Sequence, residues 1–185
     1  MQIDMAAASL RLIVVVVLVA VSISLRSVAA TVTVEDACRH TKHEAYCVRA
    51  LSARPESKAA ADMPALAELA LSLAAESGAA TASFVRNLGK MPGGMPPLCL
   101  EGCVAKFQEA VAELRRSKAA LEDRRDAACA KAGVSAARAD GDTCMDECRK
   151  VEGGAAPEIA DRITELGKLC SIALALTDAS MSKHP

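Results

Sequence analysis

Aromatic residues are scarce in this 185-residue chain, which has one Tyr, two Phe and no Trp. Enzymes that cleave sugars tend to present aromatic platforms to their substrates, and the sequence contains neither a G-x-S-x-G nucleophile elbow nor a phosphate-binding P-loop. Carboxylates for glycoside hydrolysis are plentiful by count. Their spacing is nevertheless typical of solvated helix faces, as for Glu101, Glu109, Glu113, Glu122 and Glu165. We therefore predict that the protein is not an enzyme and uses no cofactor.

An excess of charge of one sign is also missing. The chain holds 22 basic and 23 acidic residues, and its formal net charge is −1. Arg11, Arg26 and Asp4 lie in the first 30 residues, which leaves 20 basic and 22 acidic residues in the other 155. Both signs are interspersed, so no basic footprint for nucleic acid or an anionic membrane exists, and neither is predicted as a partner.

The long apolar run at residues 12–25 (LIVVVVLVAVSISL) is short for a membrane span, which needs about 20 apolar residues. Arg11 precedes this run, and RSVAA follows it with small residues at Val28 and Ala30. This pattern is typical of a secretory signal peptide that ends near Ala30. An uncleaved anchor is the alternative. We predict a signal peptide at residues 1–30 and one secreted domain at residues 31–185, which is large enough for a single core.

Strand signals are nearly absent after residue 30, whereas Ala, Leu, Glu, Lys and Arg, which favour helices, dominate. The sequence therefore predicts an all-α fold. A short N-terminal helical hairpin is expected at residues 31–57, and an up-down-up-down four-helix bundle at residues 58–182. The four helices are predicted at residues 62–88, 98–121, 124–148 and from Pro157 onward. In the third, Gly133 and Gly141 predict a kink or break near residues 140–142.

Apolar residues at three- and four-residue spacing predict the inner faces of these helices. The first helix is expected to bury Leu66, Leu69, Leu73, Ser77, Ala80, Phe84 and Leu88. The second is expected to bury Cys99, Cys103, Phe107, Val111, Leu114 and Leu121, with the Lys118 stem along the edge of this face and its ammonium group in water. For the last helix the same spacing selects Ile159, Ile163, Leu166, Cys170, Ala173 and Thr177.

Eight cysteines follow Ala30, and in a secreted chain an even number indicates a disulfide framework. Cys103 and Cys144 lie equally far from the turn predicted around residues 121–125, and so do Cys99 and Cys148. Each pair of cysteines on one helix is spaced four apart and shares a face. This register predicts two disulfides, Cys103–Cys144 and Cys99–Cys148, one helical turn apart.

The remaining cysteines are assigned less directly. Cys129 points about 60° around its helix from Cys144, toward a different neighbour, and Cys170 on the last helix is the expected partner. Cys38 and Cys47 are then left, and they are close to each other in sequence. We predict the disulfides Cys129–Cys170 and Cys38–Cys47.

The segment CRHTKHEAYC, residues 38–47, permits another chemistry. Cys38, His40, His43 and Cys47 are suitable zinc ligands. Zinc modules, however, usually pair ligands as C-x2–4-C with a separate H-x3–5-H, and a secreted chain favours disulfides. No metal site is predicted, and the two histidines remain available for a pH-dependent interaction.

The order and spacing of several segments between Asp36 and Leu176 resemble the plant invertase and pectin methylesterase inhibitor family. CRHTKHEAYCVRAL resembles its opening cysteine loop, and PESKAAADMPALAELAL is similar to the run that enters its first bundle helix. CVAKFQEAVAELRRS resembles the helix of its third cysteine, with Phe107 in place of the usual tyrosine. VSAARADGDTCMDECR is similar to its threonine-cysteine segment. The chain is also similar to pollen allergen-like members.

The resemblance implies a hairpin closed by Cys38–Cys47, a four-helix bundle closed by Cys103–Cys144, and a secreted inhibitor of a cell-wall carbohydrate enzyme. Its targets would be pectin methylesterase or acid invertase, bound 1:1 over the active-site cleft in the apoplast. Invertase inhibitors often carry Pro-Lys-Phe between the second and third bundle helices. The sequence ALEDRRDAA stands there instead, which favours pectin methylesterase. A diverged interaction protein without an enzyme target is the competing interpretation. The candidate target contacts are Glu122, Asp123, Arg124 and Arg125.

Overall fold

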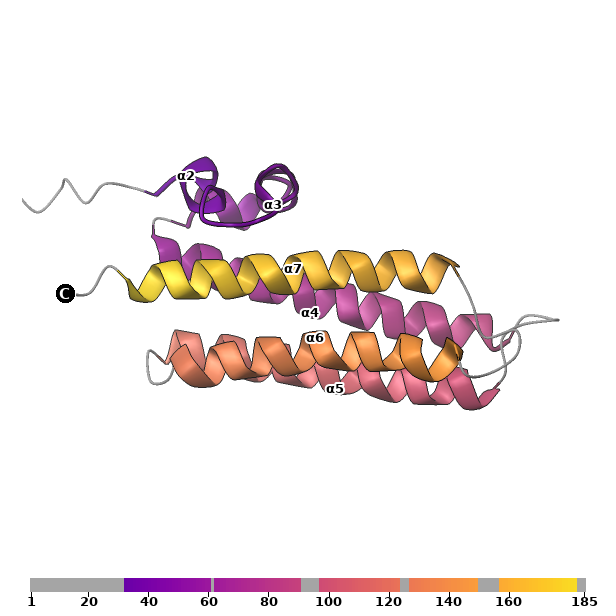
Figure 1. Cartoon of the computed structure of the whole chain (residues 1–185). Coiled ribbons are helices and arrows are strands. Elements are labelled where there is room, and N and C mark those ends of the chain that lie inside the picture. Colours follow the sequence, from indigo (N-terminus) through magenta and orange to yellow (C-terminus); the bar gives the residue numbers. More distant parts are fainter. Residues whose placement is uncertain (1–31, 61, 91–96, 124–126, 150–156, 183–185) are drawn as a thin grey trace, which may run out of the picture. The chain divides into compact units, whose positions relative to one another are not determined.

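The computed structural model describes residues 32–60, 62–90, 97–123, 127–149 and 157–182, and these are helical apart from short turns. The predicted all-α architecture is confirmed: a short hairpin precedes a four-helix bundle (Figure 1). The elements are α2 (Val34–Cys38), α3 (Glu44–Ser52), the 3-10 helix η1 (Pro55–Lys58), α4 (Met63–Leu88), α5 (Pro97–Glu122), α6 (Ala127–Arg149) and α7 (Pro157–Met181). The predicted signal peptide lies outside the described residues. Within the described part of the chain, no helix has the length and apolarity of a membrane span.

Two helices begin at the polar residues that their sequences favour. The Asp62 carboxylate accepts a hydrogen bond from the backbone N–H of Ala65 at 3.0 Å, and Pro64 occupies the first turn of α4. The Thr33 hydroxyl caps α2 in the same way, accepting from the N–H of Asp36 at 3.1 Å. Each cap satisfies one of the N–H groups that a helix start leaves without a partner.

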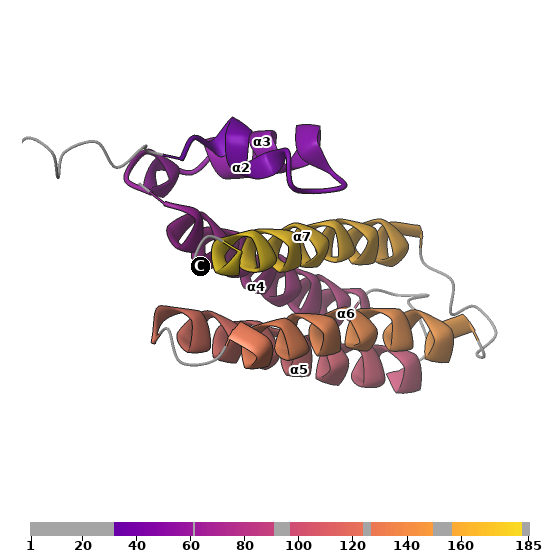
Figure 2. The ribbon, with the colours of Figure 1, turned by 60° about the vertical axis from the view of Figure 1, so that its left-hand side comes forward.

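The four long helices run alternately up and down. Each packs against its neighbours in sequence, and α7 closes the bundle against α4 (Figures 1 and 2). In both views α7 lies between the hairpin and α6. The hairpin packs on the α4 and α7 side of the bundle. This order of helices leaves α5 on the side remote from the hairpin, where it pairs with α6.

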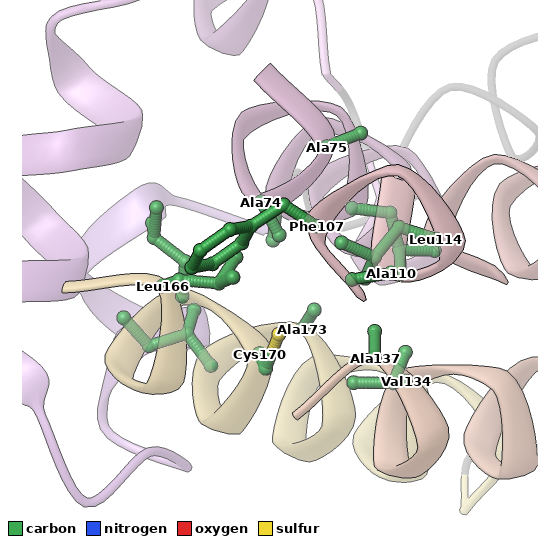
Figure 3. Packing of buried hydrophobic residues seen from close by; sticks show 14 of the residues in the cluster. Ala74, Ala75, Phe107, Ala110, Leu114, Val134, Ala137, Leu166, Cys170 and Ala173 are labelled. Carbon is green, nitrogen blue, oxygen red and sulfur yellow. The ribbon is translucent and has the colours of Figure 1, made fainter. Parts of the chain in front are cut away.

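The interior is built mainly from alanine and leucine around one aromatic ring. Phe107 is fully buried, and Figure 3 shows its ring next to Leu166 and Ala74. The predicted inner face of α5 is confirmed, and Lys118 is half-buried at its edge as expected. The predicted face of α7 is buried as well, apart from the half-buried Ile163. Small side chains allow these helices to approach closely and leave Phe107 to fill the centre.

The predicted inner face of α4 is wrong by about one residue. Of its predicted members only Leu66 is buried, whereas Leu69, Leu73 and Phe84 are half-buried. The buried face consists of Met63, Leu66, Ala67, Ala70, Leu71, Ala74, Ala75, Gly78, Thr81, Ala82 and Val85. The neighbouring helices select this face because its small residues let them approach, and the larger side chains cover the rim of the core instead.

The predicted break in α6 is also wrong, because the helix is continuous through Gly133 and Gly141. Both glycines are buried and face neighbouring helices. A Cβ on Gly133 would stand 2.3 Å from Ser117 Oγ and 3.2 Å from the Glu113 carbonyl oxygen, both on α5. Close packing of α5 against α6 therefore requires glycine here, and that packing outweighs its low helix propensity.

Candidate functional site

A disulfide clamps the loop that contains the histidines. Cys38 and Cys47 are bonded, with their Cα atoms 5.6 Å apart, so their thiolates are not available to a metal. His40 is exposed, and His43 is half-buried directly before α3. Residues 32–60, 62–90, 97–123, 127–149 and 157–182 contain no group of three or more His, Cys, Asp or Glu side chains arranged to hold a metal ion. The segment is thus a clamp for the hairpin.

Charged and aromatic contacts fix this hairpin on the bundle. The Tyr46 ring of α3 has the Arg49 guanidinium 5.4 Å and the Lys168 ammonium of α7 5.5 Å from its centroid. Burial, followed by the nearby Glu165 carboxylate, raises the pKa of Tyr46 above its usual value. Arg54 also forms an ion pair with Glu76 of α4. These cation–π and ionic contacts orient the hairpin relative to α4 and α7.

A second disulfide joins α5 to α6. Cys103 and Cys144 are bonded, with a Cα–Cα distance of 4.6 Å, as the sequence register predicts. Cys99, one turn away, is also in a disulfide. The side chain of its predicted partner Cys148 lies outside the described residues, so that pairing remains a prediction. The Cys103–Cys144 bond links α5 covalently to α6.

Charged residues on the surface of the α5–α6 pair form a network that the sequence interpretation missed. The Lys106 ammonium contacts the Glu109 carboxylate at 2.6 Å and reaches Asp140 on α6 at 3.5 Å. Partial burial raises the pKa of Asp140; Lys106 opposes this shift, while Glu109 and Glu113 add to it. The bond to Glu109 in turn raises the pKa of Lys106.

A signal for this network exists in the sequence. Lys106 and Glu109 are three residues apart on one helix, and the Cys103–Cys144 register places Lys106 opposite the region of Asp140. The surface that results carries both signs of charge at fixed positions. Such a surface can select a partner by electrostatic complementarity.

The predicted target contacts lie at the end of α5. Glu122 is the last residue of that helix, is exposed, and forms an ion pair with Lys118. Asp123 is exposed beside it, and its N–H donates to the Ala119 carbonyl at 3.0 Å. Arg124 and Arg125 lie outside the described residues. The structure therefore places Glu122 and Asp123 side by side on the surface.

The predicted Cys129–Cys170 disulfide is wrong, because Cys170 is a free and buried thiol. Lys131 of α6 forms an ion pair with Asp178 of α7 at 2.6 Å, which marks the register of these two antiparallel helices. In that register Cys170 faces the region of residue 139, close to Arg138, and both residues line one cleft. Residue 129 is about ten positions away, or about 15 Å along a helix, which exceeds the reach of a disulfide. The side chain of Cys129 lies outside the described residues.

Comparisons with known proteins agree with this architecture. Residues 32–176 match the family model described as plant invertase/pectin methylesterase inhibitor. The rice (Oryza sativa subsp. japonica) protein "Pectinesterase inhibitor 28" is 34% identical over 155 residues, covering 78% of this chain and 67% of the rice protein.

Two crystal structures of Arabidopsis pectin methylesterase inhibitors have the same fold. A mutant form superposes with a TM-score of 0.62 at 24% identity, covering 76% of this chain and 92% of the other. A second has a TM-score of 0.57 at 22% identity, covering 80% and 95%. The family match spans the hairpin, the described helices α4–α6 and most of α7. The chain belongs to the plant invertase/pectin methylesterase inhibitor family.

Proposed function

We propose that this protein is a secreted, non-catalytic inhibitor of pectin methylesterase that binds its target 1:1 in the cell wall. The observation that carries the proposal is the 34% identity to a rice pectinesterase inhibitor across 78% of this chain. The absence of Pro-Lys-Phe from ALEDRRDAA at residues 120–128 also supports pectin methylesterase over acid invertase. Acid invertase remains the alternative target because the family includes inhibitors of both enzymes.

The α5–α6 pair is the surface that we propose for the target. Its helices are held together by Cys103–Cys144 and by the close approach of Gly133 to α5. A surface that is already ordered loses little conformational entropy on binding, so more of the interaction energy remains as affinity. The exposed carboxylates of Glu122 and Asp123 lie at one end of this surface, where they can meet cationic groups beside the enzyme's cleft.

The proposal is tested by titrating the oxidised protein, produced through a secretory pathway, against a plant pectin methylesterase and an acid invertase. We expect saturable inhibition of the esterase at a 1:1 ratio and none of the invertase. Inhibition of the invertase alone would establish the alternative. Inhibition of neither enzyme would reject an inhibitory function and leave a secreted interaction protein without an enzyme target.

The contact surface is tested by reversing one charge at each end of α5. Glu122→Lys is expected to weaken inhibition by about tenfold, because one charge-assisted contact contributes roughly 1.4 kcal/mol. Glu101→Lys is the control, since Glu101 is also exposed but lies about 30 Å away along the same helix. Equal effects of both substitutions would show a long-range charge effect. They would exclude a direct contact between the target and the end of α5 that carries Glu122.

A further inference from the structure

A cleft lies where the hairpin meets α6 and α7, and no function proposed above uses it. It has a volume of about 330 Å³, within the range of small-ligand sites. The hairpin contributes His40 and Lys42, α6 contributes Ser135 and Arg138, and α7 contributes Ser171 and Asp178. Val134, Cys170, Leu174 and Ala175 complete its lining. Three separate segments of the chain therefore build one concave, mixed polar and apolar site.

The cleft carries an excess of positive charge. Among the described residues, none forms an ion pair with His40, Lys42 or Arg138. Its one lining carboxylate, Asp178, is already neutralised by Lys131 at 2.6 Å. Lys42 and Arg138 therefore leave two uncompensated positive charges in the cleft. An anion is the ligand that this charge distribution favours.

The cationic side of the cleft is held in place by the local backbone. Cys38–Cys47 closes the hairpin loop, and the Thr41 N–H and hydroxyl both bond the Cys38 carbonyl oxygen, at 2.9 and 2.8 Å. Lys42 follows directly in this restrained loop. Arg138 extends from the continuous helix α6. The backbone that presents the two cations is thus ordered before a ligand arrives, which lowers the entropic cost of binding.

We infer that this cleft binds the carboxylate of a uronic acid residue in de-esterified pectin. Lys42 and Arg138 would pair with the carboxylate, and the Ser135 and Ser171 hydroxyls would bond the ring hydroxyls. Leu174 and Ala175 would lie under the apolar ring face. This inference rests on the proposed function, because removal of methyl esters by pectin methylesterase creates these carboxylates. The cleft would then hold the inhibitor on the product of its target enzyme.

The size and lining of the cleft favour a sugar acid over an acidic protein segment. The site is a pocket bounded by the hairpin, α6 and α7, and it offers two serine hydroxyls beside the two cations. It provides no aromatic platform, so charge must supply most of the affinity. Binding should consequently weaken several-fold when salt rises from about 50 to about 300 mM.

The test measures binding without any enzyme, so that its failure and the failure of the inhibitor proposal can be told apart. Trigalacturonate is titrated into the oxidised, isotope-labelled protein at low salt, and amide shifts are followed by NMR. We expect saturable shifts centred on Ser135, Ser171 and Leu174. The fully methyl-esterified trimer is the matched neutral ligand and should cause none. Inorganic phosphate and sulfate test whether any anion suffices.

Substitutions in the cleft complete the test. Lys42→Gln and Arg138→Gln should each raise the dissociation constant for trigalacturonate by about tenfold, the loss expected for one charge-assisted contact. Lys58→Gln and Arg86→Gln are matched controls, since both residues are exposed and lie outside the cleft and the α5–α6 pair. The Lys42, Lys58 and Arg86 variants should inhibit the target enzyme as the unsubstituted protein does.

Several outcomes would overturn the inference. They are no saturable binding of trigalacturonate, equal losses in the cleft and control variants, or binding of phosphate as tight as that of trigalacturonate. Weaker enzyme inhibition by the two cleft variants, without trigalacturonate binding, would instead assign the cleft to the protein target.

Discussion

Gly133 on α6 lies so close to Ser117 on α5 that a Cβ on the glycine would stand 2.3 Å from the serine Oγ. The serine cannot easily turn away, because its hydroxyl donates to the Glu113 carbonyl at 2.9 Å and its side chain is buried. This contact determines how closely the two helices of the proposed interface approach each other.

We predict that Gly133→Ala lowers the free energy of unfolding by about 1–3 kcal/mol, the usual cost of overpacking a core. The substitution would otherwise gain almost 1 kcal/mol from helix propensity. Gly167→Ala on α7 is the control, because no atom lies within 4 Å of its added Cβ, and it should stabilise by about 0.5–1 kcal/mol. Urea unfolding at equilibrium measures both changes.

A partial rescue distinguishes a clash with Ser117 from a general loss of helix packing. In the Gly133→Ala background, Ser117→Ala removes the Oγ atom but leaves the Glu113 carbonyl 3.2 Å from the new Cβ. The double variant should recover part of the lost stability. Strictly additive effects of the two substitutions would show that Ser117 is not the obstacle.

The hairpin disulfide should stabilise the fold by restricting the conformations of the unfolded chain. Closing the loop from Cys38 to Cys47 reduces unfolded-state entropy by an amount worth about 2.7 kcal/mol. Replacement of both cysteines by serine should lower the free energy of unfolding by roughly this amount. Thermal unfolding of the double variant and the unsubstituted protein provides the comparison. No change in melting temperature would show that packing alone holds the hairpin.

Metal removal should have no effect, because Cys38 and Cys47 are bonded to each other. Dialysis against EDTA is expected to leave the melting temperature unchanged, whereas dithiothreitol should lower it. Elemental analysis of the oxidised protein provides an independent readout. Stoichiometric zinc, lost together with stability on EDTA treatment, would restore the metal interpretation of residues 38–47.

The free thiol of Cys170 should be unreactive in the native protein. Burial raises its pKa to about 12, and Arg138 lowers it only in part. Because the thiolate is the nucleophile, iodoacetamide at mildly alkaline pH should modify Cys170 only after unfolding in urea. Peptide mapping under non-reducing conditions measures the labelling. A peptide linked to Cys129 would contradict the register derived from Lys131 and Asp178.

Asp140 should make stability depend on pH in the acidic range. Its pKa is raised mainly by burial, so the native state holds this proton more tightly than the unfolded chain does. The free energy of unfolding should therefore fall as pH rises through the window directly above the usual aspartate pKa of about 3.9. Asp140→Asn should flatten this part of the profile.

The comparison uses urea unfolding at a series of pH values. Asp142→Asn, an exposed position on the same helix, should retain the slope of the unsubstituted protein. A loss of stability at neutral pH in Asp140→Asn would show that the ion pair with Lys106 outweighs the cost of burying the carboxylate.

Helix identity and the positions of two disulfides could be predicted from local information. The helix start at Asp62, the inner faces of α5 and α7, and the Cys103–Cys144 register depend on residue spacing along one helix or across one short turn. The hairpin disulfide is likewise local in sequence. These features follow from helical periodicity, which each helix has independently of the helices that pack against it.

The candidate site was only partly accessible to the same reasoning. Glu122 and Asp123 could be placed at a helix end from sequence, and the Cys103–Cys144 register brings Lys106 to the region of Asp140. The cleft between the hairpin, α6 and α7 could not be predicted. It joins Lys42 to Arg138, which are nearly one hundred positions apart in the chain.

The sequence by itself determined that the chain is helical, where its long helices lie, and which cysteines close its two local clamps. Tertiary structure alone decided which face of α4 is buried, why α6 continues through two glycines, and why Cys170 has no disulfide partner. The physical reason is close packing. How near two helices approach, and in what register, depends on the side chains of both, so no single helix can specify it.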